Sequence, residues 1–396
     1  MGLPPHGVRT PAGPLGLCLG EVSRGSSQFL RKVHVLGTGS FLPGPPVTVD
    51  EIDARLGGLD DAPEAVRRFS AGAGRRLAEH AGVRHRHFAI DPATGELTHD
   101  FAGLAREACV RALAQSAVAP DEVDLLVVSM PGVDDFTPPT SATLQAELGI
   151  ERCAEIAVHS NCSGVGKAVQ IAMDAIRVGR CRTALVAYSQ LSSIFLRSAW
   201  LTQPAMTRSQ ALMRWILSDG SGAMVLRAAD DPEAPGHELV EAHAMSIGGT
   251  LPPAMTCGLG ARLMRTQRVG LADLVAQGLH HLDQDFGAVS EFSAARLEAL
   301  LLDFANVLDL KHDDIHHYVL SIPTVKLYED ARKRIDYLDW DRCPFRCATS
   351  GYCGGASILV HLDEMARGGA LRPGELAMCY SVESSKWMGG GFLVRW

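Results

Sequence analysis

The chain lacks the features that mark membrane, secreted and nucleic-acid-binding proteins. None of its apolar runs reaches the roughly 18 residues that a membrane-spanning helix needs. The stretch from Pro14 to Gly20 is too short and too interrupted for the core of a signal peptide. We therefore expect residues 1–30 to form a flexible leader, and the protein to be cytoplasmic with no membrane partner. Basic residues are not in excess either, and the net charge of −8 argues against nucleic acid as the main partner.

Metal-binding and dinucleotide-binding patterns are also missing. Cys343 and Cys347 are four residues apart, but no second pair of Cys or His stands beside them at zinc-finger spacing. The doublet His280-His281 has no histidine four residues away. The pair Gly37-x-Gly39 is too short for a dinucleotide fingerprint. We expect no metal and no cofactor, and we expect the ten cysteines to be reduced.

The composition is that of an ordinary globular protein that can form two cores. The chain has 396 residues, of which 46% are hydrophobic and 21% charged. Strand-like and helix-like segments alternate, which predicts an α/β fold with largely parallel central strands. The predicted strands are 33–39, 123–130, 155–160, 183–190, 222–227, 238–246, 315–321, 375–381 and 391–396. The predicted helices are 100–116, 141–148, 164–178, 294–308, 325–335 and 356–365.

Three motifs occur twice in the same order, which indicates two homologous halves. Asn161-Cys162-Ser163-Gly164 opens one predicted helix, and Tyr352-Cys353-Gly354-Gly355 opens another. Each helix is followed by a similar strand, and each half ends on a glycine-rich strand. The Pro- and Gly-containing linker at 228–236 separates them. We therefore predict an N-terminal half over residues 31–230 and a C-terminal half over residues 231–396.

Cys162 is the most informative residue, because it lies where a predicted strand turns into a predicted helix. Val165, Val169 and Met173 recur at helical spacing after it, and Gly179 follows as the expected end of the helix. A thiol at a helix start faces free backbone N–H groups and the positive end of the helix dipole. Both favour the thiolate, which is the nucleophilic form. The alternative is a buried structural thiol, but the position at this turn favours attack on an electrophilic carbon such as a thioester carbonyl.

The order of the motifs resembles the thiolase superfamily, and within it the ketoacyl synthase III branch. Thr38–Pro43 resembles the family's opening strand and turn, and residues 123–141 resemble its strand and loop before the nucleophile. Ser218–Ala223 resembles its Asp-Gly-x-Gly-Ala turn. The resemblance spans about residues 33–396 and makes Cys162 the nucleophile. It implies a five-layered α-β-α-β-α fold of two duplicated halves. It also implies acyl transfer from thioesters of coenzyme A or acyl carrier protein.

The resemblance implies two catalytic partners that this chain has replaced. The family's His follows the strand 315–320, and the register places Ser321 there. The family's Asn opens the loop at 351–357, and the register places Tyr352 there. Both replacements carry an O–H group that can donate to a developing oxyanion, but serine is not a base near neutral pH. Ordinary decarboxylative condensation is therefore in doubt.

Three other residues are candidates for the catalytic base or for a group in the pocket. His317 is roughly 13 Å along the strand from Ser321, which is too far, and His159 is three residues before Cys162 and is expected to point away. Glu383 falls where the family tends to have a glycine-rich loop, and it is either a pocket residue or a solvated surface residue.

Two further sites come from the resemblance. Arg262, Arg265 and Arg268 lie where related enzymes tend to bind the nucleotide or carrier end of the thioester, although a solvated charged loop is the alternative. Phe136 resembles the position that covers the partner's tunnel across a dimer. The resemblance thus implies a homodimer, or a heterodimer with a related ketosynthase.

Three functions remain open at this level. The first is an acyltransferase of the ketoacyl synthase III type that moves an acyl group through Cys162 to an alcohol or amine in specialised, polyketide-like or fatty-acid-like biosynthesis. The second is carbon–carbon condensation with an altered site. The third is a non-catalytic partner subunit, against which the retained cysteine argues.

Overall fold

The computed structural model describes residues 30–396 except 231–233, 259 and 262–269. Nine of the described strands form one sheet in the order β3-β2-β4-β5-β1-β6-β11-β10-β9. Their bounds are β1 Lys32–Phe41, β2 Leu125–Met130, β3 Ala154–His159, β4 Thr183–Gln190, β5 Gly220–Ala229, β6 His237–Ser246, β9 His317–Ser321, β10 Leu376–Glu383 and β11 Met388–Arg395. A short second sheet pairs β7 (Met255–Cys257) with β8 (Leu282–Gln284).

The sheet consists of two similar parts joined by a weak seam. β2 and β4 are parallel, β4 and β5 antiparallel, and β5 and β1 antiparallel. The same sequence of pairings runs through β9, β10, β11 and β6. Between the two parts, β1 and β6 pair at only two positions, His34 with Glu238 and Val35 with His237. The pairing pattern is therefore repeated on the two sides of the seam.

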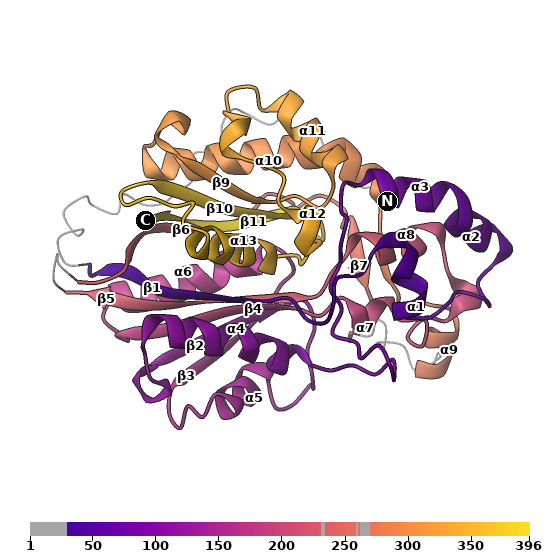
Figure 1. Cartoon of the computed structure of the whole chain (residues 1–396), viewed down its shortest axis with the longest axis horizontal. Helices are drawn as coiled ribbons and strands as arrows, with labels where there is room; N and C mark the ends of the chain where they lie inside the picture. The colour runs from indigo at the N-terminus through magenta and orange to yellow at the C-terminus, as the bar shows by residue number, and fades with distance from the viewer. Residues whose placement is uncertain (1–29, 231–233, 259, 262–269) are drawn as a thin grey trace, which may run out of the picture.

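Helices and sheet parts alternate in five layers (Figure 1). α4 (Phe101–Ser116) and α5 (Thr140–Glu147) cover the outer face of the first part, and α10 (Phe286–Leu308) and α11 (Val325–Arg334) lie outside the second. α6 (Gly164–Arg177) and α13 (Ala356–Arg367) lie between the parts and contact strands of both. This arrangement confirms the predicted five-layered α-β-α-β-α fold.

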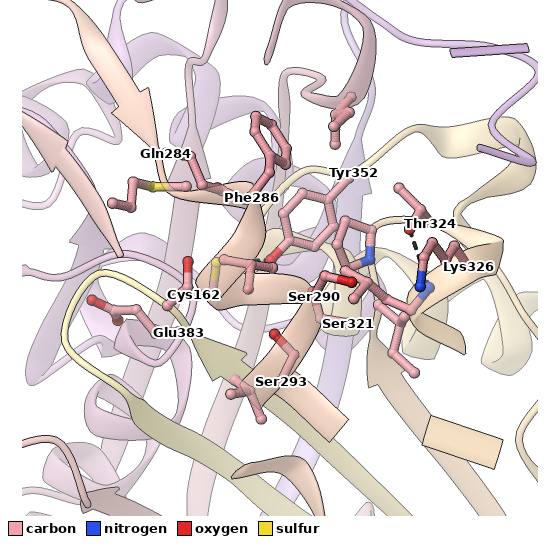
Figure 2. Close-up of a pocket in the computed structure, with 18 of the residues that line it drawn as sticks. Cys162, Gln284, Phe286, Ser290, Ser293, Ser321, Thr324, Lys326, Tyr352 and Glu383 are labelled. Atoms are coloured by element: carbon pink, nitrogen blue, oxygen red, sulfur yellow. Dashed lines mark hydrogen bonds between the residues drawn. The ribbon is translucent and has the colours of Figure 1, made fainter. Parts of the chain in front are cut away.

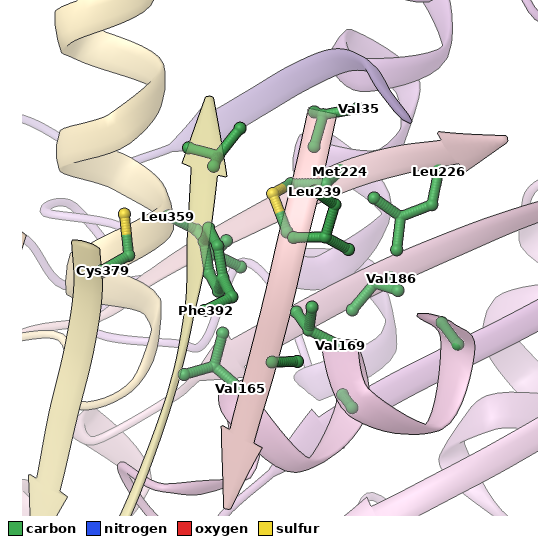
Figure 3. Packing of buried hydrophobic residues seen from close by; sticks show 14 of the residues in the cluster. Val35, Val165, Val169, Val186, Met224, Leu226, Leu239, Leu359, Cys379 and Phe392 are labelled. Carbon is green, nitrogen blue, oxygen red and sulfur yellow. The ribbon is translucent and has the colours of Figure 1, made fainter. Parts of the chain in front are cut away.

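The core between the two sheet parts fixes the position of α6. Val165 and Val169 on α6 are fully buried in one cluster with Met224 of β5 and Phe392 of β11 (Figure 3). Gly166 lets the helix approach β11 closely, because a Cβ there would lie 2.1 Å from the backbone nitrogen of Gly391. The start of α6 is thus held against the C-terminal half of the chain.

A cap of shorter elements covers one end of the sheet (Figure 1). It contains β7, β8 and the helices α1 (Ile52–Leu56), α2 (Glu64–Phe69), α3 (Arg75–His80), α7 (Ser193–Leu196), α8 (Arg208–Ile216) and α9 (Leu271–Ala276). α12 (Cys347–Ser350) precedes α13. None of these elements was predicted from the sequence, because most are too short to show a clear hydrophobic period.

Two predicted boundaries were wrong in ways that concern the site. α10 was expected to begin at 294 but begins at Phe286, where the Asp285 carboxylate accepts a hydrogen bond from the Ala288 backbone nitrogen and caps the helix. β10 was expected to end at 381 but continues to Glu383, paired with Met388 of β11. Glu383 therefore lies on a strand rather than in a loop.

Some predictions fall outside these observations. Residues 1–29 of the expected leader are not among the described residues, and the division of the chain at residue 230 stays a prediction. Within the described parts of the chain, no helix is both long enough and apolar enough to cross a bilayer.

Candidate active site

Cys162 lies in the turn between β3 and α6, two residues before the first residue of the helix. Ser163 is the N-cap of α6, and its carbonyl and that of Asn161 begin the helical hydrogen bonds. This is the predicted strand-to-helix turn. Gly179 has a φ of +77° and follows the last turn of α6, as expected for a residue that ends a helix.

A cavity of about 410 Å³ reaches the sulfur of Cys162 (Figure 2). Its lining is mostly apolar, and one face of α10 contributes Phe286, Val289, Ser290, Ser293 and Leu297. The same cavity is lined by Leu77 of α3, which is 55% exposed, so it opens to solvent. The thiol therefore lies at a mostly apolar cavity that is open to solvent, as an acyl-binding site requires.

Tyr352 is the closest polar partner of the nucleophile. Its hydroxyl oxygen lies 2.9 Å from Cys162 Sγ. Tyr352 follows Gly351, whose φ is +69° and whose Cβ, if present, would lie 2.6 Å from the side chain of Ser218. A tight turn available to glycine thus directs the Tyr352 ring into the cavity beside the thiol.

Ser321 also lines the cavity, at the carboxyl end of β9. Its hydroxyl donates a hydrogen bond to the Gly354 carbonyl oxygen at 2.8 Å. The hydrogen of the Ser321 hydroxyl is therefore directed at the backbone and does not point toward an oxyanion in the cavity. Of the two replacements for the family's His and Asn, only Tyr352 contacts the sulfur.

Glu383 is a buried cavity residue, so the surface interpretation is wrong. It is 2% exposed and lines the same cavity as Cys162. Its Oε2 accepts hydrogen bonds from Ser163 N at 3.1 Å, Ser163 Oγ at 2.6 Å and Ser160 Oγ at 3.1 Å. Its Oε1 accepts one from Ser385 Oγ. The carboxylate therefore occupies the N-terminus of α6.

The expectation of a favoured thiolate is contradicted by the surroundings of Cys162. Burial, and secondarily the negative charge of Glu383, raise the pKa of the thiol to about 12, although the Tyr352 hydroxyl lowers it. The helix N-terminus that was expected to stabilise a thiolate already donates to Glu383. Cys162 is consequently a neutral thiol at physiological pH in the unliganded protein.

The histidines considered as bases do not take part. His317 Nε2 lies 2.8 Å from a carboxylate oxygen of Glu375. His159, an exposed residue of β3, has its Nε2 3.1 Å from the Pro131 carbonyl oxygen. Neither lines the cavity. Both are therefore engaged away from the cavity, as expected from the distance of His317 and the direction of His159.

Of the remaining predicted site residues, Phe136 lies among the described residues and does not line the cavity. Phe136 is 88% exposed, in the loop before α5. Arg262, Arg265 and Arg268 lie outside the described residues. In the described parts of the chain, no group of three His, Cys, Asp or Glu side chains is arranged to hold a metal ion.

Lys167 and two serines of α10, Ser290 and Ser293, were not predicted as site residues. Lys167 Nζ donates to Ser160 Oγ at 2.8 Å, and Ser160 in turn donates to Glu383. A lysine in the otherwise apolar first turns of α6 was a usable signal. The role of α10 was not visible, because Ser290 and Ser293 look like ordinary surface positions until the helix is placed over the site.

Comparison with known proteins agrees with this geometry. No protein-family model matches the chain. It is 28% identical over 379 residues to the beta-ketoacyl-[acyl-carrier-protein] synthase III of Rhodospirillum centenum, covering 93% of this chain and 99% of that one.

Two solved structures share the fold. One is the 3-oxoacyl-(acyl carrier protein) synthase III of Pseudomonas aeruginosa, with a TM-score of 0.71, 24% identity and coverage of 92% of this chain and 98% of that one. The other is AbyA1, a tetronic acid condensing enzyme, with a TM-score of 0.72, 24% identity and coverage of 92% and 100%. The chain is therefore similar over most of its length to beta-ketoacyl-[acyl-carrier-protein] synthase III proteins, and it shares their fold.

Proposed function

We propose that the protein is an acyltransferase of the ketoacyl synthase III type, acting through an acyl thioester on Cys162. The acyl donor is a thioester of coenzyme A or of an acyl carrier protein, and the acceptor is an alcohol or amine in a specialised biosynthetic pathway. The curated relatives are enzymes that carry the synthase III name. Their names support an enzyme that handles acyl thioesters.

The observation that carries this proposal is the position of the Cys162 sulfur at an apolar cavity, 2.9 Å from the Tyr352 hydroxyl. The apolar wall offers space for an acyl chain, and the solvent-connected end offers a path for the carrier arm. His80 and Lys326 line the cavity, and the Lys326 side chain is 67% exposed. The cationic ammonium group of Lys326 suits an anionic phosphate group on that arm.

Acylation in this site is a thioester exchange. The Cys162 sulfur attacks the donor carbonyl carbon, and the S–H proton passes to the sulfur of the departing carrier. The C–S bond to the carrier breaks as the new C–S bond forms, leaving acyl-Cys162 and the free carrier thiol. Tyr352 donates its O–H to the sulfur while negative charge is present there, which offsets part of the cost of the buried thiolate.

Intact mass spectrometry after incubation with a panel of acyl-CoA and acyl-carrier thioesters tests the proposal. We expect a mass increase of one acyl group on the wild-type protein and none on Cys162→Ala. Cys181→Ala is a matched control, because Cys181 is a partly exposed thiol far from the cavity lining. Absence of an adduct with every donor would reject the acyltransferase and favour the non-catalytic partner subunit.

A second candidate, decarboxylative condensation, is favoured by the names of the relatives, which are synthases and a condensing enzyme. The site argues against it, because Ser321 and Tyr352 replace the expected His and Asn and Glu383 adds a negative charge. Release of carbon dioxide from a malonyl-carrier thioester, dependent on acyl-Cys162, would establish condensation instead of transfer to an alcohol or amine.

The quaternary structure that we propose is a dimer, either of two copies or with a related ketosynthase. The exposed Phe136 supports this proposal, since a phenyl ring that is 88% exposed can be buried against a second chain. Analytical ultracentrifugation of the wild type and of Phe136→Ser tests it, with a weakened dimer as the expected result.

A further inference from the structure

Glu383 is an ionisable cavity residue to which the steps above assign no role. It is 2% exposed, and it lines the same cavity as Cys162 (Figure 2). A carboxylate buried this deeply is costly unless hydrogen bonds and a counter-charge compensate for the lost hydration. The protein supplies both, so the carboxylate is built into the site.

The hydrogen bonds to Glu383 are unequally divided between its two oxygens. Oε2 accepts from Ser160 Oγ and from both the backbone N–H and the hydroxyl of Ser163. Among the hydrogen bonds of the described residues, Oε1 accepts only from Ser385 Oγ. Oε1 therefore retains the capacity to accept another hydrogen bond from a molecule in the cavity.

The counter-charge reaches the carboxylate indirectly. Lys167 Nζ donates to Ser160 Oγ at 2.8 Å, and the Ser160 hydroxyl donates to Glu383 Oε2 at 3.1 Å. Among the hydrogen bonds of the described residues, the lysine thus reaches the carboxylate through the Ser160 hydroxyl. In the described parts of the chain, Glu383 has no direct ion pair with a cationic side chain, and its contacts are hydrogen bonds from serine hydroxyls and one backbone N–H.

We propose that Glu383 is the base that removes the proton of the acceptor when the acyl group leaves Cys162, and that the acceptor is accordingly an uncharged O–H or N–H nucleophile. This inference rests on the proposed function, because it concerns the second half of the same reaction. Glu383 belongs to strand β10, and its carboxylate accepts a hydrogen bond from the backbone nitrogen of Ser163, the residue next to the acylated cysteine. An acceptor that attacks the Cys162 acyl carbonyl therefore reacts beside the carboxylate.

The step balances without any additional reactant. The acceptor oxygen or nitrogen forms a bond to the acyl carbonyl carbon while its proton moves to Glu383. The tetrahedral intermediate then expels the Cys162 sulfur, and the proton moves from Glu383 to that sulfur. The products are the ester or amide and the neutral Cys162 thiol, and Glu383 returns to its ionised form.

The same charge makes malonyl thioesters poor acceptors. Their free carboxylate would have to enter a largely apolar cavity that already holds the negative charge of Glu383, and repulsion between like charges is strong where water is excluded. A neutral alcohol or amine meets no such repulsion. Glu383 would thus both activate the acceptor and select its class.

The test follows the decay of acyl-Cys162 by intact mass spectrometry after excess donor has been removed. Water is the O–H probe, and N-acetylcysteamine is the thiol probe, which attacks as a thiolate that has already lost its proton. We expect Glu383→Gln to slow hydrolysis by at least about 100-fold, the range typical for loss of a general base. Acylation should not become slower, because loss of the charge lowers the pKa of the Cys162 thiol, and thiolysis should change less than about threefold. Glu383→Asp should recover part of the hydrolysis rate.

A matched control is Glu122→Gln, since Glu122 pairs with Arg227 on the surface of the first half. It should hydrolyse acyl-Cys162 at the wild-type rate. The proposal is overturned if Glu383→Gln hydrolyses its adduct as fast as the wild type, or if hydrolysis and thiolysis fall together, which is the result of a purely structural role. If the wild type forms no adduct at all, the proposed function fails, and this inference fails with it.

Discussion

The Tyr352 hydroxyl lies 2.9 Å from the Cys162 sulfur, in the position where the resemblance to ketoacyl synthase III implies an asparagine. The contact joins the beginnings of two related parts of the chain, since Cys162 precedes α6 and Tyr352 precedes α13. The hydroxyl is the polar group that lowers the pKa of the buried thiol, against burial and the charge of Glu383.

Removing this hydroxyl should make Cys162 less reactive. In Tyr352→Phe the thiolate loses a donor, and a hydrogen bond to a charged group contributes about 1.5–3 kcal/mol. The rate of acyl adduct formation should fall by about 10- to 100-fold. Stopped-flow or quenched mass spectrometry measures this rate. Tyr337→Phe, a hydroxyl deletion outside the cavity lining, is the control, and equal rates for both variants would contradict the role of Tyr352.

Removing the negative charge of Glu383 should make Cys162 easier to ionise. The charge raises the pKa of the thiol, so Glu383→Gln should lower that pKa. At pH 7 to 9, which is below the wild-type value of about 12, the rate of alkylation by iodoacetamide follows the thiolate fraction. The variant should therefore react faster at each pH. Alkylation of the variant at the wild-type rate or slower would show that the charge does not reach the sulfur.

A buried histidine should make the fold less stable in acid. His361 is fully buried in α13, and burial lowers its pKa to about 3. An unfolded chain has a histidine pKa near 6.5, so below that pH the unfolded state binds more protons and stability is lost as the pH falls. The loss between pH 7.5 and pH 5 is about 2 kcal/mol.

Urea unfolding of the wild type and of His361→Gln at pH 7.5 and pH 5 measures this contribution. The variant lacks the titrating group, so its free energy of unfolding should decrease less between the two pH values. An equal decrease in both proteins would mean that His361 is protonated without cost in the folded state.

Filling the cavity from α10 should shorten the longest acyl chain that Cys162 accepts. Ser293 lines the cavity beside Ser321 (Figure 2), and Ser293→Phe places a ring in that space. We expect adducts from short-chain donors to persist and those from long-chain donors to disappear in mass spectra. Glu291→Phe adds the same ring at an exposed position two residues earlier and should leave the chain-length profile unchanged.

Periodicity in the sequence predicted every strand of the nine-stranded sheet and the helices of all layers, since these elements are long and regularly patterned. It predicted α6 and the position of Cys162 before it. It failed where a single side chain sets a boundary, as Asp285 does by capping α10 at 286. It also failed for the cap around α8, whose elements are held by contacts with distant segments.

The resemblance to a known family pointed to Ser321 and Tyr352, and both line the cavity. The resemblance did not distinguish their roles. In the structure, the Ser321 hydroxyl donates to the Gly354 carbonyl oxygen, whereas the Tyr352 hydroxyl contacts the sulfur. That difference depends on the relative positions of β9, α12 and α13. The local sequence at each position contains no information about it.

The sequence by itself determined the α/β layering, the strands of the main sheet and the cysteine at the strand-to-helix turn, because local periodicity and turn residues specify such elements. Its expectation of largely parallel central strands was wrong, since the pairs from β4 through β5, β1, β6 and β11 to β10 are antiparallel. Only the tertiary structure decided the ionisation state of that cysteine and the burial of Glu383. Both depend on groups more than 200 residues apart, such as Ser163 and Glu383, which meet only when α6 packs between the two parts of the sheet. Burial and charge act through space, so the helix N-terminus that alone would favour a thiolate instead holds a carboxylate.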